Sequence, residues 1–409
     1  MTFHRTDISR RAVLAIGLGG AAGLGTALPA FAQKQYGPGV TDTEIKIGNI
    51  LPYSGPASSY SVIGKTLQGY FNRLNEQGGV NGRKIRLLSL DDGYNPSKTV
   101  EQARKLVEQE EVLFIGAVLG TATNLAIQKY MNAKKVPQLF VQSGASRWND
   151  PKNFPWTMGF QPSYQVEAAI HARHILQNAP NAKIGILSQN DDLGRDYLKG
   201  FLDALGDKAK TMVVSQQTYE FTDPTIDSQL VQFKASGADT FFNVSTPKFA
   251  AMAIRRSAEI GWKPTQYLGS VAASFQSVIK PAGLDNAQGL ITATFIRDAS
   301  DPVQRQTPEV RDYLAFMAKY YPEGNPNENL NGLAYNMGML MEQVLKQAGD
   351  TLTRENVMKQ ATALDLTLPM LSAGMRVKTS PTDYAPLEQL QMLRVKGEAY
   401  EPFGPVQPL

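Results

Sequence analysis

The 409-residue sequence contains no cysteine and only three histidines. Without cysteine no disulfide can form, and with 42% hydrophobic residues the chain can build sizeable cores without one. Acidic and basic residues nearly balance, at 37 and 41, which predicts neither a nucleic-acid nor a membrane partner. No run reaches the roughly 20 strongly apolar residues of a membrane span, since five glycines dilute the apolar stretch at 12–28.

The first 32 residues have the pattern of an export signal. Ser9-Arg10-Arg11 precedes the apolar stretch, and Ala30-Phe31-Ala32 follows it as a small-residue cleavage site. The arginine pair resembles the twin-arginine signal, although Val13 and Ala15 replace its Phe and Lys, so the choice between Tat and Sec export stays open. We expect cleavage near Ala32 and a mature protein free in the periplasm, because a lipid-anchored form would need a cysteine.

Strand and helix patterns alternate along the rest of the chain. Such alternation predicts an α/β protein with parallel, doubly wound sheets, whose ligands bind beyond the carboxyl ends of the strands. The predicted strands are 44–51, 84–90, 112–117, 138–141, 183–188 and 240–244, and the predicted helices are 60–77, 96–110, 123–133, 194–205 and 248–261.

Short motifs that could indicate an enzyme or a cofactor site fail on their context. The G-x-G-x-x-A match at 17–22 lies inside the export signal, and Gly64-Lys65-Thr66 lacks the upstream glycine of a P-loop. Ser277 and Lys280 fit S-x-x-K without its companion motifs. We therefore predict no catalytic residues and no cofactor.

Histidines and paired carboxylates give no stronger signal. His171 and His174 stand i,i+3 on a presumed helix without further ligands, so we expect a solvated face and no metal site. The aspartate pairs at 91–92 and 191–192 follow the ends of predicted strands. Adjacent carboxylates there more often cap turns than share a proton.

Several motifs fall in the order of one known family. They are Gly48-Asn-Ile-Leu-Pro-Tyr-Ser-Gly-Pro56, Asn75-Glu-Gln-Gly-Gly-Val-Asn-Gly-Arg-Lys84, Leu90-Asp-Asp-Gly-Tyr-Asn-Pro96, Gly116-Ala-Val-Leu-Gly-Thr-Ala-Thr-Asn124, Ala334-Tyr-Asn336 and Ala348-Gly349. Together they resemble the leucine/isoleucine/valine-type substrate-binding proteins of ABC importers. The resemblance covers nearly the whole mature chain.

This resemblance implies the type I periplasmic-binding fold, with two Rossmann-like lobes joined by three crossovers. Laid on this sequence, lobe 1 comprises 43–161 and 292–372, and lobe 2 comprises 162–291 and 373–409. Closure of the lobes by hinge bending would trap a small molecule and present the closed form to the importer's membrane permeases. A monomer suffices for this role.

The resemblance also points to binding residues. In the family, two strand-end loops of lobe 1 hold a ligand carboxylate, and helix starts favour an anion there. The implied positions are Leu119, Gly120, Thr121, Ser143, Ala145 and Ser146 in these loops, Tyr60 against the apolar part of the ligand, and Asn190, Leu193, Thr246 and Val271 from lobe 2. The loop residues would otherwise be caps and turns only, and Tyr60 would be core.

Val271 carries most of the information on the ligand. Amino-acid-binding members of the family present a carboxylate to the ligand ammonium from this loop, and a buried ammonium facing valine would be left unpaired. We therefore expect an acid without an ammonium group, aromatic or largely apolar. Asp191 or Asp192 could instead supply the charge, which would restore a branched-chain amino acid as the ligand. Two other classes, a ligand-sensing receptor module and an unrecognised exported enzyme, stay open.

Overall fold

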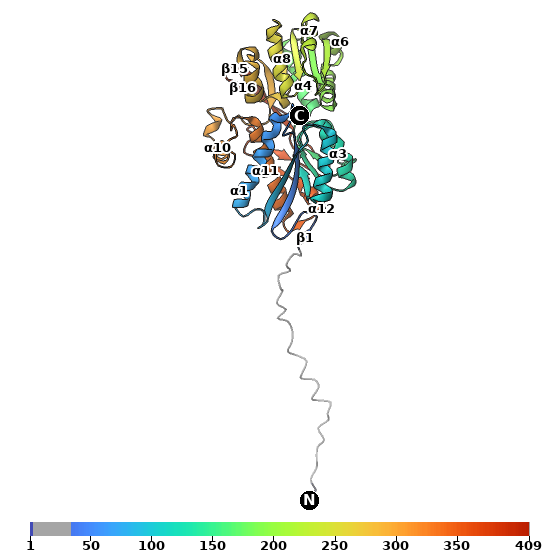
Figure 1. The fold of residues 1–409 in the computed structure, drawn as a ribbon, viewed down its shortest axis with the longest axis vertical. Helices are drawn as coiled ribbons and strands as arrows, with labels where there is room; N and C mark the ends of the chain where they lie inside the picture. The colour runs from blue at the N-terminus through green and yellow to red at the C-terminus, as the bar shows by residue number, and fades with distance from the viewer. Residues whose placement is uncertain (3–33, 409) are drawn as a thin grey trace. The chain divides into compact units, whose positions relative to one another are not determined.

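The computed structural model describes residues 1–2 and 34–408, and the predicted export signal lies almost wholly outside these residues. From Gln35 onward the chain forms one compact unit with two sheets (Figure 1). The first sheet defines lobe 1. Its strands, in spatial order, are β3 (Lys84–Asp91), β2 (Glu44–Leu51), β4 (Phe114–Gly116), β5 (Gln138–Val141) and β6 (Thr157–Gly159).

All neighbouring strands of this sheet are parallel. Its central strands β4 and β5 are buried at every residue, as expected where helices cover both faces. The predicted strands 44–51 and 138–141 are confirmed to the residue. Parallel pairing brings the carboxyl ends of these strands, and the loops that follow them, to one edge of the sheet.

The helices of lobe 1 come from two distant parts of the chain. The first part supplies α1 (Val62–Glu76), α2 (Pro96–Arg104) and α3 (Thr121–Ala133), and the second supplies α10 (Pro308–Tyr320), α11 (Asn329–Ala348) and α12 (Arg354–Ala361). Helices α1 and α11 pack closely because Gly338 lies against Tyr70, where a Cβ atom would come within 2.5 Å of the ring. The predicted helix 96–110 is right up to Arg104, after which Lys105–Gln109 continue as a π-helical turn.

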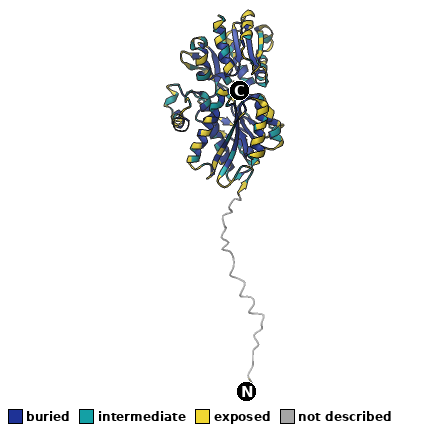
Figure 2. Ribbon diagram, viewed as in Figure 1, coloured by how far each residue is buried: buried dark blue, intermediate teal, exposed yellow. Residues whose placement is uncertain are grey.

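The second sheet defines lobe 2. Across the sheet its strands are β16 (Ala399–Pro408), β15 (Gln389–Lys396), β11 (Ile291–Thr294), β10 (Thr265–Leu268), β9 (Thr240–Val244), β7 (Ile184–Gln189) and β8 (Val213–Tyr219). Its helices are α4 (Tyr164–Asn178), α5 (Asp192–Leu205), α6 (Ala209–Met212), α7 (Asp227–Ala235), α8 (Pro247–Glu259) and α9 (Lys280–Ala282). The central strands of both sheets are buried, whereas the edge strands β3, β8 and β16 and the outward helix faces carry exposed residues (Figure 2).

The chain crosses between the sheets three times, after β6, after β11 and before β15. The predicted boundary at residue 292 falls inside β11, which pairs with β10, so the second crossing follows Thr294. Short strand pairs complete the fold. They are β1 (Gln35–Tyr36) with β12 (Thr351–Leu352), and β13 (Asp365–Leu366) with β14 (Val377–Lys378). Since β14 pairs with β13 next to α12, the chain reaches the second sheet only with β15, later than the predicted boundary at 373.

Candidate ligand-binding site

A cavity of about 50 Å³ lies where the strand-end loops meet the first two crossovers. On that measure one water molecule needs roughly 10–15 Å³, so the cavity suits a compact ligand. It is lined by Tyr60, Ile63, Tyr94, Leu119, Gly120, Gln142, Gln161, Tyr164, Leu193, Thr246, Ser270, Val271, Ala293, Thr294, Phe295, Ile296, Asn329, Leu330 and Leu333. Among the described residues, those that line this cavity include no charged side chain.

Aromatic rings form much of the wall. Tyr60, Tyr94, Tyr164 and Phe295 are each at most 7% exposed. Burial raises the pKa of Tyr164 to about 12 and raises the pKa values of Tyr60 and Tyr94 well above the usual range. These hydroxyls therefore stay protonated near neutral pH and act as neutral hydrogen-bonding groups.

Tyr60 connects the two lobes across the cavity. It lies in the 3-10 turn η1 (Ser58–Ser61) before α1, and its hydroxyl donates to the backbone carbonyl of Val271 at 2.9 Å. Val271 belongs to the turn η5 (Ser270–Ala272) of lobe 2. Tyr60 thus lines the cavity and also forms a hydrogen bond between the lobes.

The loop after β4 contributes backbone to the cavity. Gly120 has a φ of +100°, and a Cβ atom there would lie 2.5 Å from the ring of Tyr94 and 2.7 Å from the Thr123 hydroxyl. No side chain caps the start of α3, so its first N–H groups lack an intrahelical partner. Leu119 and Gly120 line the cavity, whereas the Thr121 hydroxyl is bonded to that of Ser143 at 2.7 Å.

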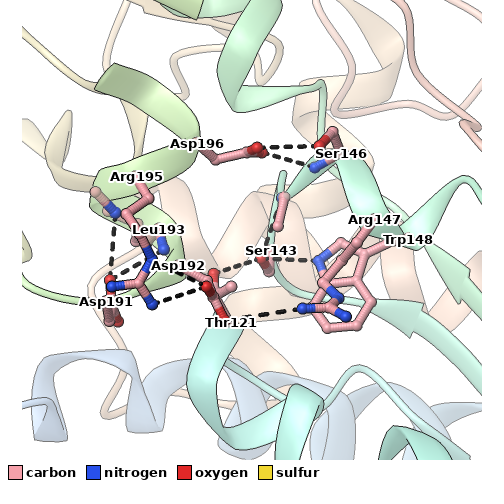
Figure 3. A network of polar contacts seen from close by, with 12 residues as sticks. Thr121, Ser143, Ser146, Arg147, Trp148, Asp191, Asp192, Leu193, Arg195 and Asp196 are labelled. Atoms are coloured by element: carbon pink, nitrogen blue, oxygen red, sulfur yellow. Dashed lines mark hydrogen bonds and ion pairs between the residues drawn. The ribbon is translucent and has the colours of Figure 1, made fainter. Parts of the chain in front are cut away.

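The polar groups of the loop after β5 form hydrogen bonds with other residues of the protein. The Ser143 hydroxyl accepts from Trp148 Nε1 and from the Ala145 N–H. The N–H and hydroxyl of Ser146 donate to the carboxylate of Asp196 on α5, at 2.7 and 3.0 Å (Figure 3). Ser143, Ala145 and Ser146 line a separate hollow beside Trp148, so the structure does not bring them to the cavity.

Three of the four predicted lobe 2 residues line the cavity, namely Leu193, Thr246 and Val271. Asn190 does not, because its exposed side chain donates to Glu220. The two carboxylates that could have paired with a ligand ammonium, Asp191 and Asp192, also have partners elsewhere in the protein. Asp191 caps α5 through the N–H groups of residues 193 and 194, and Asp192 pairs with Arg195 at 2.8 Å (Figure 3). Burial raises the pKa of Asp191.

A buried carboxylate stands behind the lobe 2 wall. Glu167 of α4 is 1% exposed and accepts the N–H and hydroxyl of Ser270, each at 2.6 Å, together with the hydroxyl of Tyr197 at 2.8 Å. The ring of Tyr197 stacks on that of Tyr164, with centroids 4.6 Å apart. Three donors thus satisfy the carboxylate of Glu167 without help from a ligand, and the ring Nε2 of His171 lies 3.6 Å from its Oε1.

Sequence reasoning missed most of the wall. Tyr94 follows a predicted strand end within a family-like motif, so the strand-end rule could have found it. Phe295 lies in the second crossover and Asn329 begins α11, and where both lie depends on the tertiary fold. Ser270 and Gln142 lie within or beside the loops that we examined, and no sequence signal favoured them over their neighbours.

The expected solvated histidine face is wrong. His171 is fully buried beneath Phe242 and Tyr267, and the half-buried His174 bonds the hydroxyl of Tyr267 at 2.9 Å. The reason is that α4 packs against α5 and that its residue His171 contacts Phe242 of β9 and Tyr267 of β10. In the part of the chain that the structure describes, no cluster of three or more His, Asp or Glu side chains could hold a metal ion.

The chain belongs to the periplasmic binding protein family, which it matches over residues 44–399. A curated relative, Leu/Ile/Val-binding protein homolog 7 of Brucella abortus, is 22% identical over 301 residues, which are 71% of this chain and 74% of the relative. Over the described residues, no helix has the length and hydropathy needed to cross a membrane.

Solved structures share the fold. A branched-chain amino acid ABC transporter protein from Thermus thermophilus with bound valine superposes with a TM-score of 0.80 at 18% identity, covering 90% of this chain and 98% of that one. A solute-binding protein of an ABC transporter from R. palustris, in complex with benzoate, gives 0.75 at 19% identity, covering 89% and 98%. Both are type I periplasmic-binding folds, as the sequence motifs predicted.

Proposed function

We propose that this protein is the periplasmic substrate-binding component of an ABC importer, and that its cargo is a small, largely apolar or aromatic carboxylate without an ammonium group. The observation that carries the proposal is the absence of charged side chains from the described cavity wall. The similar proteins with bound valine and benzoate show that this fold serves ligands with and without an ammonium group.

The neutral wall disfavours an amino acid. A buried ammonium needs an anionic or strongly polar partner, and leaving it unpaired costs several kcal/mol. The carboxylates beside the wall are already satisfied, Glu167 by Ser270 and Tyr197, Asp191 by the start of α5, and Glu328 by Ser274. Recruiting any of these carboxylates would break bonds inside the protein.

A carboxylate can be held without a cation. The uncapped start of α3 follows Gly120 directly, and its N–H groups and helix dipole favour an anion. Tyr94 and Tyr164 line the cavity with hydroxyls that stay protonated, whereas the Tyr60 hydroxyl already donates to Val271. The rings themselves suit an apolar or aromatic body.

Contacts between the lobes support capture by closure. Tyr60 reaches Val271 beside the cavity, and Ser146, away from the cavity, reaches Asp196. A ligand that fills the cavity would stabilise this arrangement, which the importer's permeases would then recognise. The protein itself carries out no chemistry in this proposal, and residues 1–32 are removed on export.

A matched pair of ligands tests the proposal. Valine and isovalerate share one carbon skeleton and differ in the ammonium group, and benzoate and benzyl alcohol separate the effect of the carboxylate. We expect thermal stabilisation and calorimetric binding with isovalerate and benzoate only. A ligand at 100 times its Kd adds about 2.7 kcal/mol of stability. Preference for valine over isovalerate would instead establish a branched-chain amino acid carrier, and conversion of any acid during incubation would show an enzyme.

A further inference from the structure

A second cavity adjoins the first between the crossovers. It encloses about 30 Å³ and shares Thr294, Ile296 and Asn329 with the ligand cavity. It shares Arg297, Asp298, Leu393 and Tyr400 with a larger hollow of about 360 Å³, which also reaches Thr294 and Ile296. We name the second cavity the hinge chamber. The ligand cavity, the hinge chamber and the larger hollow thus adjoin one another around Thr294 and Ile296.

The hinge chamber has mainly apolar walls and includes space beside a glycine of α11. Phe275, Met370 and Ile296 contribute apolar surface. Gly332 of α11 faces the side chains of Met370 and Ile296, where a Cβ atom would make contacts of 3.3 to 3.5 Å. The space that the missing side chain leaves belongs to the chamber.

Two polar atoms beside the hinge chamber have no partner. Asn329 Oδ1, at the junction with the ligand cavity, and the hydroxyl of Tyr400, at the junction with the larger hollow, are both buried without a hydrogen bond. Leaving such an atom unsatisfied costs about 1–3 kcal/mol, so each calls for a partner from outside the chain. By contrast, the charged groups of the chamber are engaged, Glu328 by Ser274 at 2.7 Å and Arg297 by the Leu371 carbonyl at 2.8 Å.

We propose that the hinge chamber is a second subsite, which takes the far end of an elongated ligand. The ligand leaves the first cavity between Ile296 and Asn329, runs along the apolar wall and ends in a neutral hydroxyl or carbonyl group that bonds Tyr400. The end is neutral because the carboxylates of Glu328 and Asp298 line the same chamber, and Arg297, which also lines it, donates to the Leu371 carbonyl. This inference rests on the proposed function for the acid end of the ligand.

Affinities measured by calorimetry for butanoate, octanoate and 8-hydroxyoctanoate test the subsite. We expect octanoate to bind at least tenfold more tightly than butanoate, and the terminal hydroxyl to add about fivefold. Tyr400→Phe should abolish only the gain from the hydroxyl. Gly332→Ala, which fills part of the chamber and suits a helix better than glycine, should weaken octanoate about tenfold and leave butanoate unchanged.

Two outcomes would overturn the subsite and assign the chamber to water. One is butanoate binding with no gain in affinity from a longer chain, and the other is an equal effect of Gly332→Ala on both acids. The proposed function would stay intact in either case. If no acid binds, the proposed function fails. The pair 1-butanol and 1-octanol then tests the chamber without a carboxylate, and equal affinities would overturn it as well.

Discussion

Glu167 holds Ser270 by two hydrogen bonds of 2.6 Å, one from the backbone N–H and one from the hydroxyl. The next residue, Val271, accepts the Tyr60 hydroxyl from lobe 1. One buried carboxylate on α4 thereby fixes the turn that lines the cavity and fastens it to the opposite lobe. The same bonds make Glu167 unavailable to a cationic ligand.

Replacing Glu167 by glutamine should weaken both the fold and ligand binding. Glutamine offers one acceptor oxygen to three donors and turns an amide N–H₂ toward one of them, which costs about 1–3 kcal/mol of unfolding free energy. Denaturant unfolding and isovalerate titration measure the two effects. Tyr197→Phe is the matched control, because it removes only the third bond and should cost about 0.5–1.5 kcal/mol. Equal stability of wild type and Glu167→Gln would contradict this account of the turn.

Tyr60→Phe should weaken the contact between the lobes while keeping the aromatic ring in the cavity wall. The ring remains, but the bond to the Val271 carbonyl is lost, and one neutral hydrogen bond is worth about 0.5–1.5 kcal/mol. We expect the affinity for isovalerate or benzoate to fall between twofold and tenfold, chiefly through faster release. Tyr53→Phe serves as the control, since the Tyr53 hydroxyl bonds Ser89 away from the cavity. A similar loss of affinity in both variants would show that the bond from Tyr60 to Val271 has no particular effect on ligand binding.

The fold was largely predictable because local patterns determine its elements. The apolar run of 138–141 and the pattern of 44–51 each fit a buried parallel strand, and the structure has strands with those bounds. Parallel strands then place their following loops at one edge of each sheet. Within those loops, the family resemblance pointed to Leu119, Gly120, Leu193, Thr246 and Val271. All five line the cavity.

The orientation of donors within those loops was not predictable. Ser146 has the right residue type beside the right strand end, yet its donors meet Asp196, fifty residues later in the chain. Likewise Thr121 and Ser143 satisfy each other. Which partner a hydroxyl finds depends on how α5 packs against lobe 1, and no local pattern encodes this. The carboxylate-holding role of these loops therefore stays a prediction.

Stability should depend on pH through Glu328, which caps α11 and accepts the hydroxyl of Ser274 from lobe 2. Burial raises the pKa of Glu328. The folded state therefore holds this proton at pH values where the unfolded state has lost it, so stability is fully present below the unfolded pKa and falls as pH rises through the folded pKa. Glu328→Gln should remove this loss, so that the variant gains stability relative to wild type as pH rises above about 4.3, the ordinary pKa of glutamate. Thermal unfolding at pH values on both sides of that pKa measures the difference, and parallel pH curves would refute the assignment.

Val271→Glu tests the ligand class directly. A carboxylate at this position would face the cavity, where a second negative charge repels an acid ligand by several kcal/mol. We expect the affinity for isovalerate to fall more than tenfold, while Val271→Gln, of the same size without charge, causes a smaller loss. Valine should bind better to Val271→Glu than to wild type, because the new carboxylate can pair with its ammonium. If charge makes no difference between the two variants, the acid end does not lie within reach of Val271, and the neutral wall no longer argues for an acid without an ammonium group.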